Sequence, residues 1–197
     1  ELINKEGVIH LAAQNCHHEK SGAFTGEVSS DMLFDMGVKY VIVGHSERRQ
    51  YFGETDALVL AKAEAALDVG LRPIICCGEN ISQRNAGKHY DVVKSQLENS
   101  LLKITAAEIP HVVVAYEPVW AIGTGVNATP VQAQEMHAFI RNCIDRKYGA
   151  AIAGGNRFGR PALSISTTHT SAVNRTSGPL NTLWASSMRA PASAELR

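Results

Sequence analysis

The sequence predicts an α/β protein built around a parallel sheet. Short apolar runs alternate with stretches of helical character, and the first three runs start roughly 30 residues apart, about the size of a strand plus a crossover helix. The runs are continuously apolar, as in strands buried on both faces. Both a doubly wound sheet and a (β/α)8 barrel fit this order, and local periodicity does not choose between them. The four runs are Leu11 to Gln14, Tyr40 to Gly44, Pro73 to Cys77 and Val112 to Tyr116.

Capping residues predict where two of the intervening helices begin. Thr55 is a candidate N-cap for a helix over Asp56 to Val69, which Gly70 ends. Thr129 is followed by Pro130 and, three positions after the threonine, by a glutamine. This pattern combines an N-cap, a first-turn proline and a capping box, and it predicts a second helix.

Apolar spacing predicts a third helix between Tyr90 and Ile104, where leucine and valine recur every four residues. After Gly149 the alternation of strands and helices fails. The Ser- and Thr-rich stretch from Ser164 to Asn181 has no helical period and is a candidate disordered segment. Candidate short strands flank or overlap it, at Pro161 to Ile165 and Thr182 to Ala185.

Composition indicates one globular domain and argues against a nucleic-acid or membrane partner. The 197 residues include 45% hydrophobic residues, and 19 basic residues balance 19 acidic ones without a block of either sign. No apolar run approaches the ~18 residues of a membrane span, and the first residues lack the pattern of a signal peptide. We therefore expect a cytoplasmic protein. Its composition is compatible with a small neutral or anionic ligand.

The cysteines and histidines do not have the spacing of a disulfide scaffold or a metal site. The four cysteines lack C-x-x-C spacing, and Cys76 and Cys77 fall within an apolar run, so we expect reduced, buried thiols. The histidines show no H-x-x-x-H pattern, and we predict no metal site. No G-x-G-x-x-G or P-loop motif follows a predicted strand, which argues against dinucleotide and P-loop chemistry.

Polar residues follow each predicted strand at its carboxyl end, where functional groups gather in parallel α/β folds. Glu117 precedes Pro118, whose ring disfavours a helical conformation at the glutamate, and it is a candidate general base. The alternatives are that Glu117 caps the next helix or pairs with Arg48. His45 follows the second run, and its imidazole can donate or accept protons near neutral pH, so it is a second candidate site residue. The alternative is that His45 has a purely structural role.

The segment Val119 to Gly125 has an apolar middle and two glycines at its end, the makeup of a lid. Glycine permits both hinge motion and close approach of a backbone N–H to a phosphate oxygen, although most such glycine pairs are simple turns.

Five motifs resemble the triosephosphate isomerase family in order and spacing. The match runs from about residue 9 to residue 149 and would cover the third to sixth strands of a (β/α)8 TIM barrel. We expect residues 1–197 to form a single partial barrel domain, in which residues 150–197 are a tail that diverges from the family. The motifs are Ala12-Ala-Gln-Asn15, Ser21-Gly-Ala-Phe-Thr-Gly-Glu27, Val41-Ile-Val-Gly-His-Ser-Glu-Arg-Arg49, Cys76-Cys-Gly-Glu79 and Ala115-Tyr-Glu-Pro-Val-Trp-Ala-Ile-Gly-Thr-Gly125.

The resemblance implies interconversion of dihydroxyacetone phosphate and D-glyceraldehyde 3-phosphate through an enediolate, a step of glycolysis and gluconeogenesis, without a cofactor. It makes Glu117 the base that moves the proton and His45 the neutral electrophile, which is the known division of labour in this family. Glu47 would order the site electrostatically. Gly123 in the lid would bind the substrate phosphate through its N–H, and closure of the lid would exclude water.

The resemblance also implies a second phosphate ligand and a homodimer. Ser171 is the last serine before a Val-Asn pair, and Ser171-Ala-Val-Asn174 resembles part of the family's Gly-Gly-Ser-Val-Asn turn. The segment Cys16 to Gly26 would be the loop that family members insert into a partner subunit, with Thr25 at its tip.

The sequence departs from the family at both ends of the matching region. The family's first two βα units, with a substrate-binding lysine and asparagine, have no counterpart, and Trp184 to Met188 stands where a phosphate-binding turn is expected. We expect an incomplete barrel with exposed parallel edges, and hence low stability or aggregation of these residues alone. One alternative function is a non-catalytic remnant that acts as a structural or interaction module. Another phosphate-binding barrel enzyme is a weaker alternative, because it does not account for His45 and Glu117 together.

Overall fold

The described part of the chain forms a parallel sheet of four strands in sequence order, as predicted. The computed structural model describes residues 10–122, 124 and 126–153. Each strand pairs in parallel with the next one along the chain. The strands are β1 (Ala12–Ala13), β2 (Tyr40–Val43), β3 (Arg72–Cys77) and β4 (Val113–Tyr116).

Helices connect the strands and follow the last one. Among the described residues, no helix is long and apolar enough to cross a membrane. The α-helices are α1 (Ser30–Asp35), α2 (Ser46–Tyr51), α3 (Asp56–Asp68), α4 (Ile81–Asn85), α5 (His89–Asn99), α6 (Pro130–Tyr148) and α7 (Ala150–Ala153). The 3₁₀ helices are η1 (Leu101–Lys103), η2 (Ile109–His111) and η3 (Val119–Ala121).

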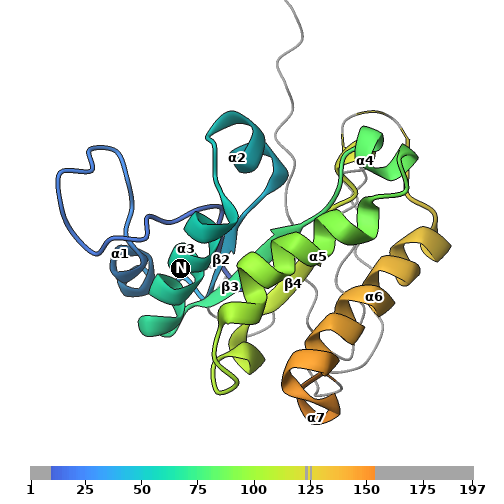
Figure 1. Cartoon of the computed structure of the whole chain (residues 1–197). Helices are drawn as coiled ribbons and strands as arrows, with labels where there is room; N and C mark the ends of the chain where they lie inside the picture. The colour runs from blue at the N-terminus through green and yellow to red at the C-terminus, as the bar shows by residue number, and fades with distance from the viewer. Residues whose placement is uncertain (1–9, 123, 125, 154–197) are drawn as a thin grey trace, which may run out of the picture.

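The sheet is buried on both faces, which explains its continuously apolar strands. In β2, Val41 and Val43 belong to the larger core together with residues of α3, α5 and α6. Tyr40 and Ile42 belong to a second buried cluster on the opposite face. Figure 1 shows α3, α5 and α6 lying along one side of the sheet. The alternation of side chains along each strand therefore divides the core into two layers.

The predicted caps of two helices are confirmed. The Thr55 side chain accepts a hydrogen bond from the Leu58 N–H at the start of α3. At the start of α6, Thr129 and Gln132 form a reciprocal capping box, and Pro130 is the first helical residue. These contacts satisfy backbone N–H groups that have no partner within the helix.

Other predicted boundaries require correction. The third helix does not continue to Ile104: α5 ends at Asn99, and the chain continues as η1. Ser100 leaves the helical path, and its hydroxyl donates to the Gln96 carbonyl at 2.6 Å. The first strand is shorter than predicted, since only two of its residues pair with β2. The candidate strands and the polar stretch beyond residue 153 lie outside the described residues.

Candidate active site

His45 lies at the carboxyl edge of the sheet, because β2 ends two residues before it. Gly44 turns the chain there with φ +74°, a left-handed conformation that glycine adopts without strain. His45 is the N-cap of α2, and its Nδ1 accepts a hydrogen bond from the Glu47 N–H at 3.3 Å. Because Nδ1 accepts a hydrogen bond, the neutral ring has its proton on Nε2.

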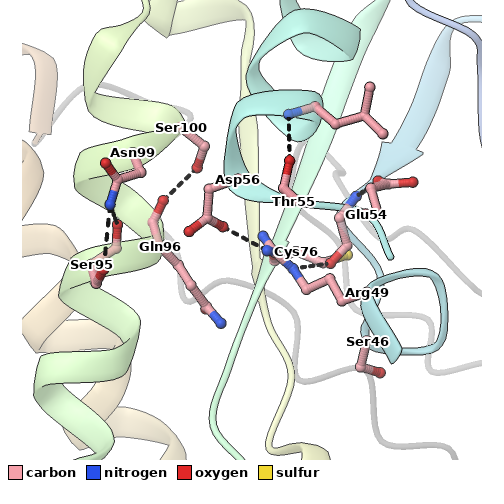
Figure 2. Close-up of polar contacts among 12 residues, drawn as sticks. Ser46, Arg49, Glu54, Thr55, Asp56, Cys76, Ser95, Gln96, Asn99 and Ser100 are labelled. Atoms are coloured by element: carbon pink, nitrogen blue, oxygen red, sulfur yellow. Dashed lines mark hydrogen bonds and ion pairs between the residues drawn. The ribbon is translucent and has the colours of Figure 1, made fainter. Parts of the chain in front are cut away.

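Two charged side chains fix the peptide groups of Gly44. Glu54 Oε1 accepts from the Gly44 N–H at 2.7 Å, and Arg49 Nε donates to the Gly44 carbonyl at 2.8 Å. Arg49 also pairs with Asp56 at 2.6 Å and donates to the Cys76 carbonyl at 3.3 Å (Figure 2). These contacts tie the end of β2 to β3, so the catalytic candidate that follows Gly44 starts from a fixed backbone.

Glu117 follows β4 and meets His45 across the intervening strand β3. Its side chain is 2% exposed, and its Oε1 lies 3.0 Å from His45 Nε2. Although this is an ion-pair distance, Oε1 accepts no hydrogen bond of good geometry from the described residues. The other oxygen, Oε2, accepts a hydrogen bond from the Ser46 N–H at 3.0 Å.

Neither of the two structural alternatives for Glu117 is observed. Arg48 pairs with Glu54 at 2.8 Å instead of with Glu117. The next helix, η3, has Pro118 as its N-cap and no side-chain capping bond. Glu117 instead accepts a hydrogen bond from the first turn of α2, where helix N–H groups favour a negative charge.

The electrostatics of the pair follow from its geometry. The Glu117 carboxylate raises the pKa of His45 above 6.5, and partial burial of the ring opposes this shift. Glu47 adds a smaller effect in the same direction as Glu117, with its Oε2 3.9 Å from His45 Nδ1 and its side chain 65% exposed.

A buried network of charged side chains supports the backbone next to His45. Lys62 Nζ donates to Glu54 Oε2 at 2.7 Å and to the Asn15 side chain at 2.8 Å. Burial raises the pKa of Glu54, but hydrogen bonds from Lys62, Arg48 and the Gly44 N–H outweigh burial and leave its pKa below 4.5. The network therefore keeps a buried carboxylate ionised against the backbone next to His45.

A third buried carboxylate, Glu79, holds the start of the predicted lid. Glu79 is fully buried and accepts hydrogen bonds from the Tyr116 hydroxyl, Trp120 Nε1 and Arg84 Nη1 at 2.8 to 3.0 Å. Burial and the Glu79 charge raise the pKa of Tyr116. Trp120 lies in η3, so this cluster connects the segment after Glu117 to the end of β3.

The remaining predicted site residues lie apart from this centre or outside the described residues. Thr25 is exposed in the segment between β1 and α1, which projects from the helices (Figure 1). The His17 N–H donates to the Val28 carbonyl at 2.8 Å and closes the base of this segment. Gly123 and Ser171 lie outside the described residues.

The sequence analysis did not identify the supporting residues Glu54 and Lys62. One signal was present: Lys62 lies on the face of α3 that includes Val59, Ala63 and Ala66, all of them buried. A lysine on an apolar helix face indicates a buried partner, but the pattern does not say which residue that partner is.

Comparison with known proteins identifies the family. The family model for triosephosphate isomerase matches residues 1–157. A triosephosphate isomerase of Cytophaga hutchinsonii is 54% identical over 153 residues, which is 78% of this chain and 60% of that protein. One from Chloroflexus aurantiacus is 56% identical over 145 residues, which is 74% of this chain and 58% of that protein.

These matches leave about two fifths of each relative without a counterpart, since the chain spans only 58–60% of their length. The matched region includes both the β2–His45 segment and the β4–Glu117 segment. The fold, the paired strand ends and these similarities agree, and the chain belongs to the triosephosphate isomerase family.

Proposed function

We propose that this chain interconverts dihydroxyacetone phosphate and D-glyceraldehyde 3-phosphate by proton transfer between neighbouring carbons. The observation that supports this most directly is the 3.0 Å approach of Glu117 Oε1 to His45 Nε2 at the carboxyl edge of the sheet. A carboxylate base next to a neutral N–H donor is what formation and collapse of an enediolate require.

Glu117 is the proposed base. It removes a proton from one carbon of the substrate and returns it to the other, so the reaction needs no oxidant and no cofactor. Its side chain is buried, and the Ser46 N–H fixes one oxygen while the other is free of directed hydrogen bonds among the described residues. A buried carboxylate with one uncommitted oxygen is suited to accept a proton.

His45 is the proposed electrophile, with Nε2–H directed at the carbonyl oxygen of the substrate. The Glu47 N–H on Nδ1 favours this tautomer. The Glu117 charge raises the pKa of His45, but a Glu117 that has taken the substrate proton is neutral and no longer does so. The negative charge then lies on the enediolate oxygen, which accepts a hydrogen bond from the neutral Nε2–H.

We assign supporting roles to three further residues. Glu47 orders the histidine, and its 3.9 Å distance from Nδ1 supports this role. Gly123 and Ser171 bind the phosphate through a backbone N–H and a hydroxyl, as the family motifs imply. The chain acts as a cytoplasmic homodimer in glycolysis and gluconeogenesis, with Thr25 at the subunit interface.

Replacement of the base tests the proposal. Glu117→Gln is expected to lower the turnover of D-glyceraldehyde 3-phosphate by about 10²- to 10⁴-fold, because the amide cannot accept the proton. Turnover is measured by coupling formation of dihydroxyacetone phosphate to NADH oxidation, and circular dichroism checks the fold. Glu64→Gln, the same change at an exposed position of α3, is the matched control. Equal turnover in both variants would refute the assignment of Glu117, and a folded wild-type chain without turnover would favour the non-catalytic remnant.

A further inference from the structure

The side chain of Gln96 on α5 binds both peptide groups of Gly78, the residue that follows β3. Gln96 Oε1 accepts from the Gly78 N–H at 2.9 Å, and Gln96 Nε2 donates to the Gly78 carbonyl at 3.1 Å. Figure 2 shows Gln96 extending from α5. A side-chain amide thus binds a backbone residue as a neighbouring strand would.

The hydrogen bonds between Gln96 and Gly78 lie where the pairing of β3 with β4 ends. The register of β3 and β4 ends at the pair Cys77 and Tyr116. Gly78 is the next residue along β3, and a primary amide presents an acceptor and a donor side by side, as a peptide does. Gln96 therefore extends the hydrogen bonding of β3 by one residue, at the edge of the sheet where the proposed base lies.

Gly78 is in direct contact with the backbone of Glu117. A Cβ atom added to Gly78 would lie 1.7 Å from the Glu117 carbonyl oxygen, so the two backbones touch with no space for a side chain. The Glu117 N–H donates to the Cys77 carbonyl at 2.8 Å, which fixes the same stretch from the other side. Movement of the Gly78 peptide would therefore displace the backbone of Glu117.

We propose that Gln96 is a positioning residue for the base Glu117 and acts through Gly78. This inference rests on the proposed isomerase function. The amide hydrogen-bonds Gly78 and so fixes the peptide against which the backbone of Glu117 packs. A base misplaced by about 1 Å can lose on the order of 10²-fold in rate, so a remote side chain that sets this position affects turnover.

Replacement of the amide by an apolar side chain of the same length tests the role. Gln96→Met in the full chain is expected to lower kcat for D-glyceraldehyde 3-phosphate by about 10- to 100-fold, with KM changed less than about threefold. Asn99→Leu, an exposed amide on the same helix, is the matched control and keeps the wild-type kcat. A Gln96→Met variant with the wild-type kcat per folded molecule overturns the proposal, even if its melting temperature falls.

Gln96→Glu supplies a readout that a purely structural role would not change. The ionised carboxylate cannot donate to the Gly78 carbonyl, whereas the protonated acid can. The ratio of its kcat to that of the wild type should therefore rise as the pH falls through the titration of the new carboxyl group. A ratio that stays constant with pH contradicts the proposal.

An NMR measurement separates this inference from the proposed function. In Gln96→Met, the Gly78 amide should exchange with solvent faster than in the wild type, and the backbone amide resonance of Glu117 should shift. Asn99→Leu should change neither. If the wild-type chain lacks isomerase activity, the proposed function fails, and these amides still report the coupling. A Glu117 resonance that is identical in Gln96→Met and wild type overturns the inference whatever the activity.

Discussion

The contact between His45 and Glu117 makes the stability of the chain depend on pH. The folded-state pKa of His45 is raised above 6.5 by the carboxylate, so the folded state binds the proton more tightly than the unfolded chain does. This contribution is fully present below the unfolded-state pKa and is lost as the pH rises through the folded-state pKa. His45→Gln removes it.

We therefore expect the difference in unfolding free energy between the wild type and His45→Gln to be largest near about pH 6 and to shrink towards about pH 9. Urea unfolding followed by circular dichroism at several pH values measures it. His111→Gln, the same change at the exposed histidine that ends η2, is the control. A difference that grows with pH would show that the carboxylate does not stabilise the charged ring.

Individual helices depend on buried charges as much as on their apolar faces. Lys62 of α3 and Glu54, which precedes α3, have side chains that are 4% and 1% exposed and lie 2.7 Å apart. Glu54 also binds Arg48 of α2 and the Gly44 N–H, so the pair connects two helices to the end of β2. Loss of one partner would leave a buried charge only partly compensated.

Lys62→Met is accordingly expected to lower the unfolding free energy by about 3 to 5 kcal/mol, because Glu54 remains buried with fewer partners. Chemical denaturation measures the loss. In the double variant Lys62→Met/Glu54→Gln the loss should be smaller than in Lys62→Met alone, since the uncompensated charge is gone. Additive losses from the two substitutions would mean that the pair is not coupled.

Sequence patterns identified those elements whose signals are local. Thr55 and Thr129 marked the starts of α3 and α6, because capping depends on residues three or four positions away. By contrast, α2 has the sequence Ser-Glu-Arg-Arg-Gln-Tyr, with no apolar period, and it was not predicted. Its position depends on contacts with residues far along the chain, which a local pattern does not contain: the Ser46 N–H donates to Glu117, and Arg49 donates to the Cys76 carbonyl.

In the candidate site, too, some features could be predicted from the sequence and others depend on tertiary packing. The parallel order of β2, β3 and β4 predicted that His45 and Glu117 would lie at one edge, and their strand-end positions are observed. The contact of Gln96 with Gly78 joins α5 to the end of β3, and the contact of Lys62 with Asn15 joins α3 to the segment after β1. Their partners depend on how helices pack on the sheet, which strand and helix periodicity leaves undetermined.

The exposed segment between β1 and α1 bears on how copies of the chain associate. Thr25 lies in an exposed turn of this segment, and the apolar side chains of Phe24, Met32 and Met36 in the segment and α1 region are 43%, 55% and 71% exposed. Figure 1 places this segment and α1 on the same side of the chain. Burial of these side chains against a second copy would remove apolar surface from water, in agreement with the proposed homodimer.

Met36→Lys is therefore expected to raise the dissociation constant of the dimer by at least about tenfold, equivalent to ~1.4 kcal/mol, because a charge replaces an apolar contact within the interface. Sedimentation velocity over a concentration series measures this constant. Val131→Lys is the matched control, since Val131 is 76% exposed in the first turn of α6, and the same change there should leave association unchanged. If both variants dissociate like the wild type, the surface formed by α1 and the segment before it is not the interface; a wild-type chain that is monomeric at all concentrations would contradict the homodimer itself.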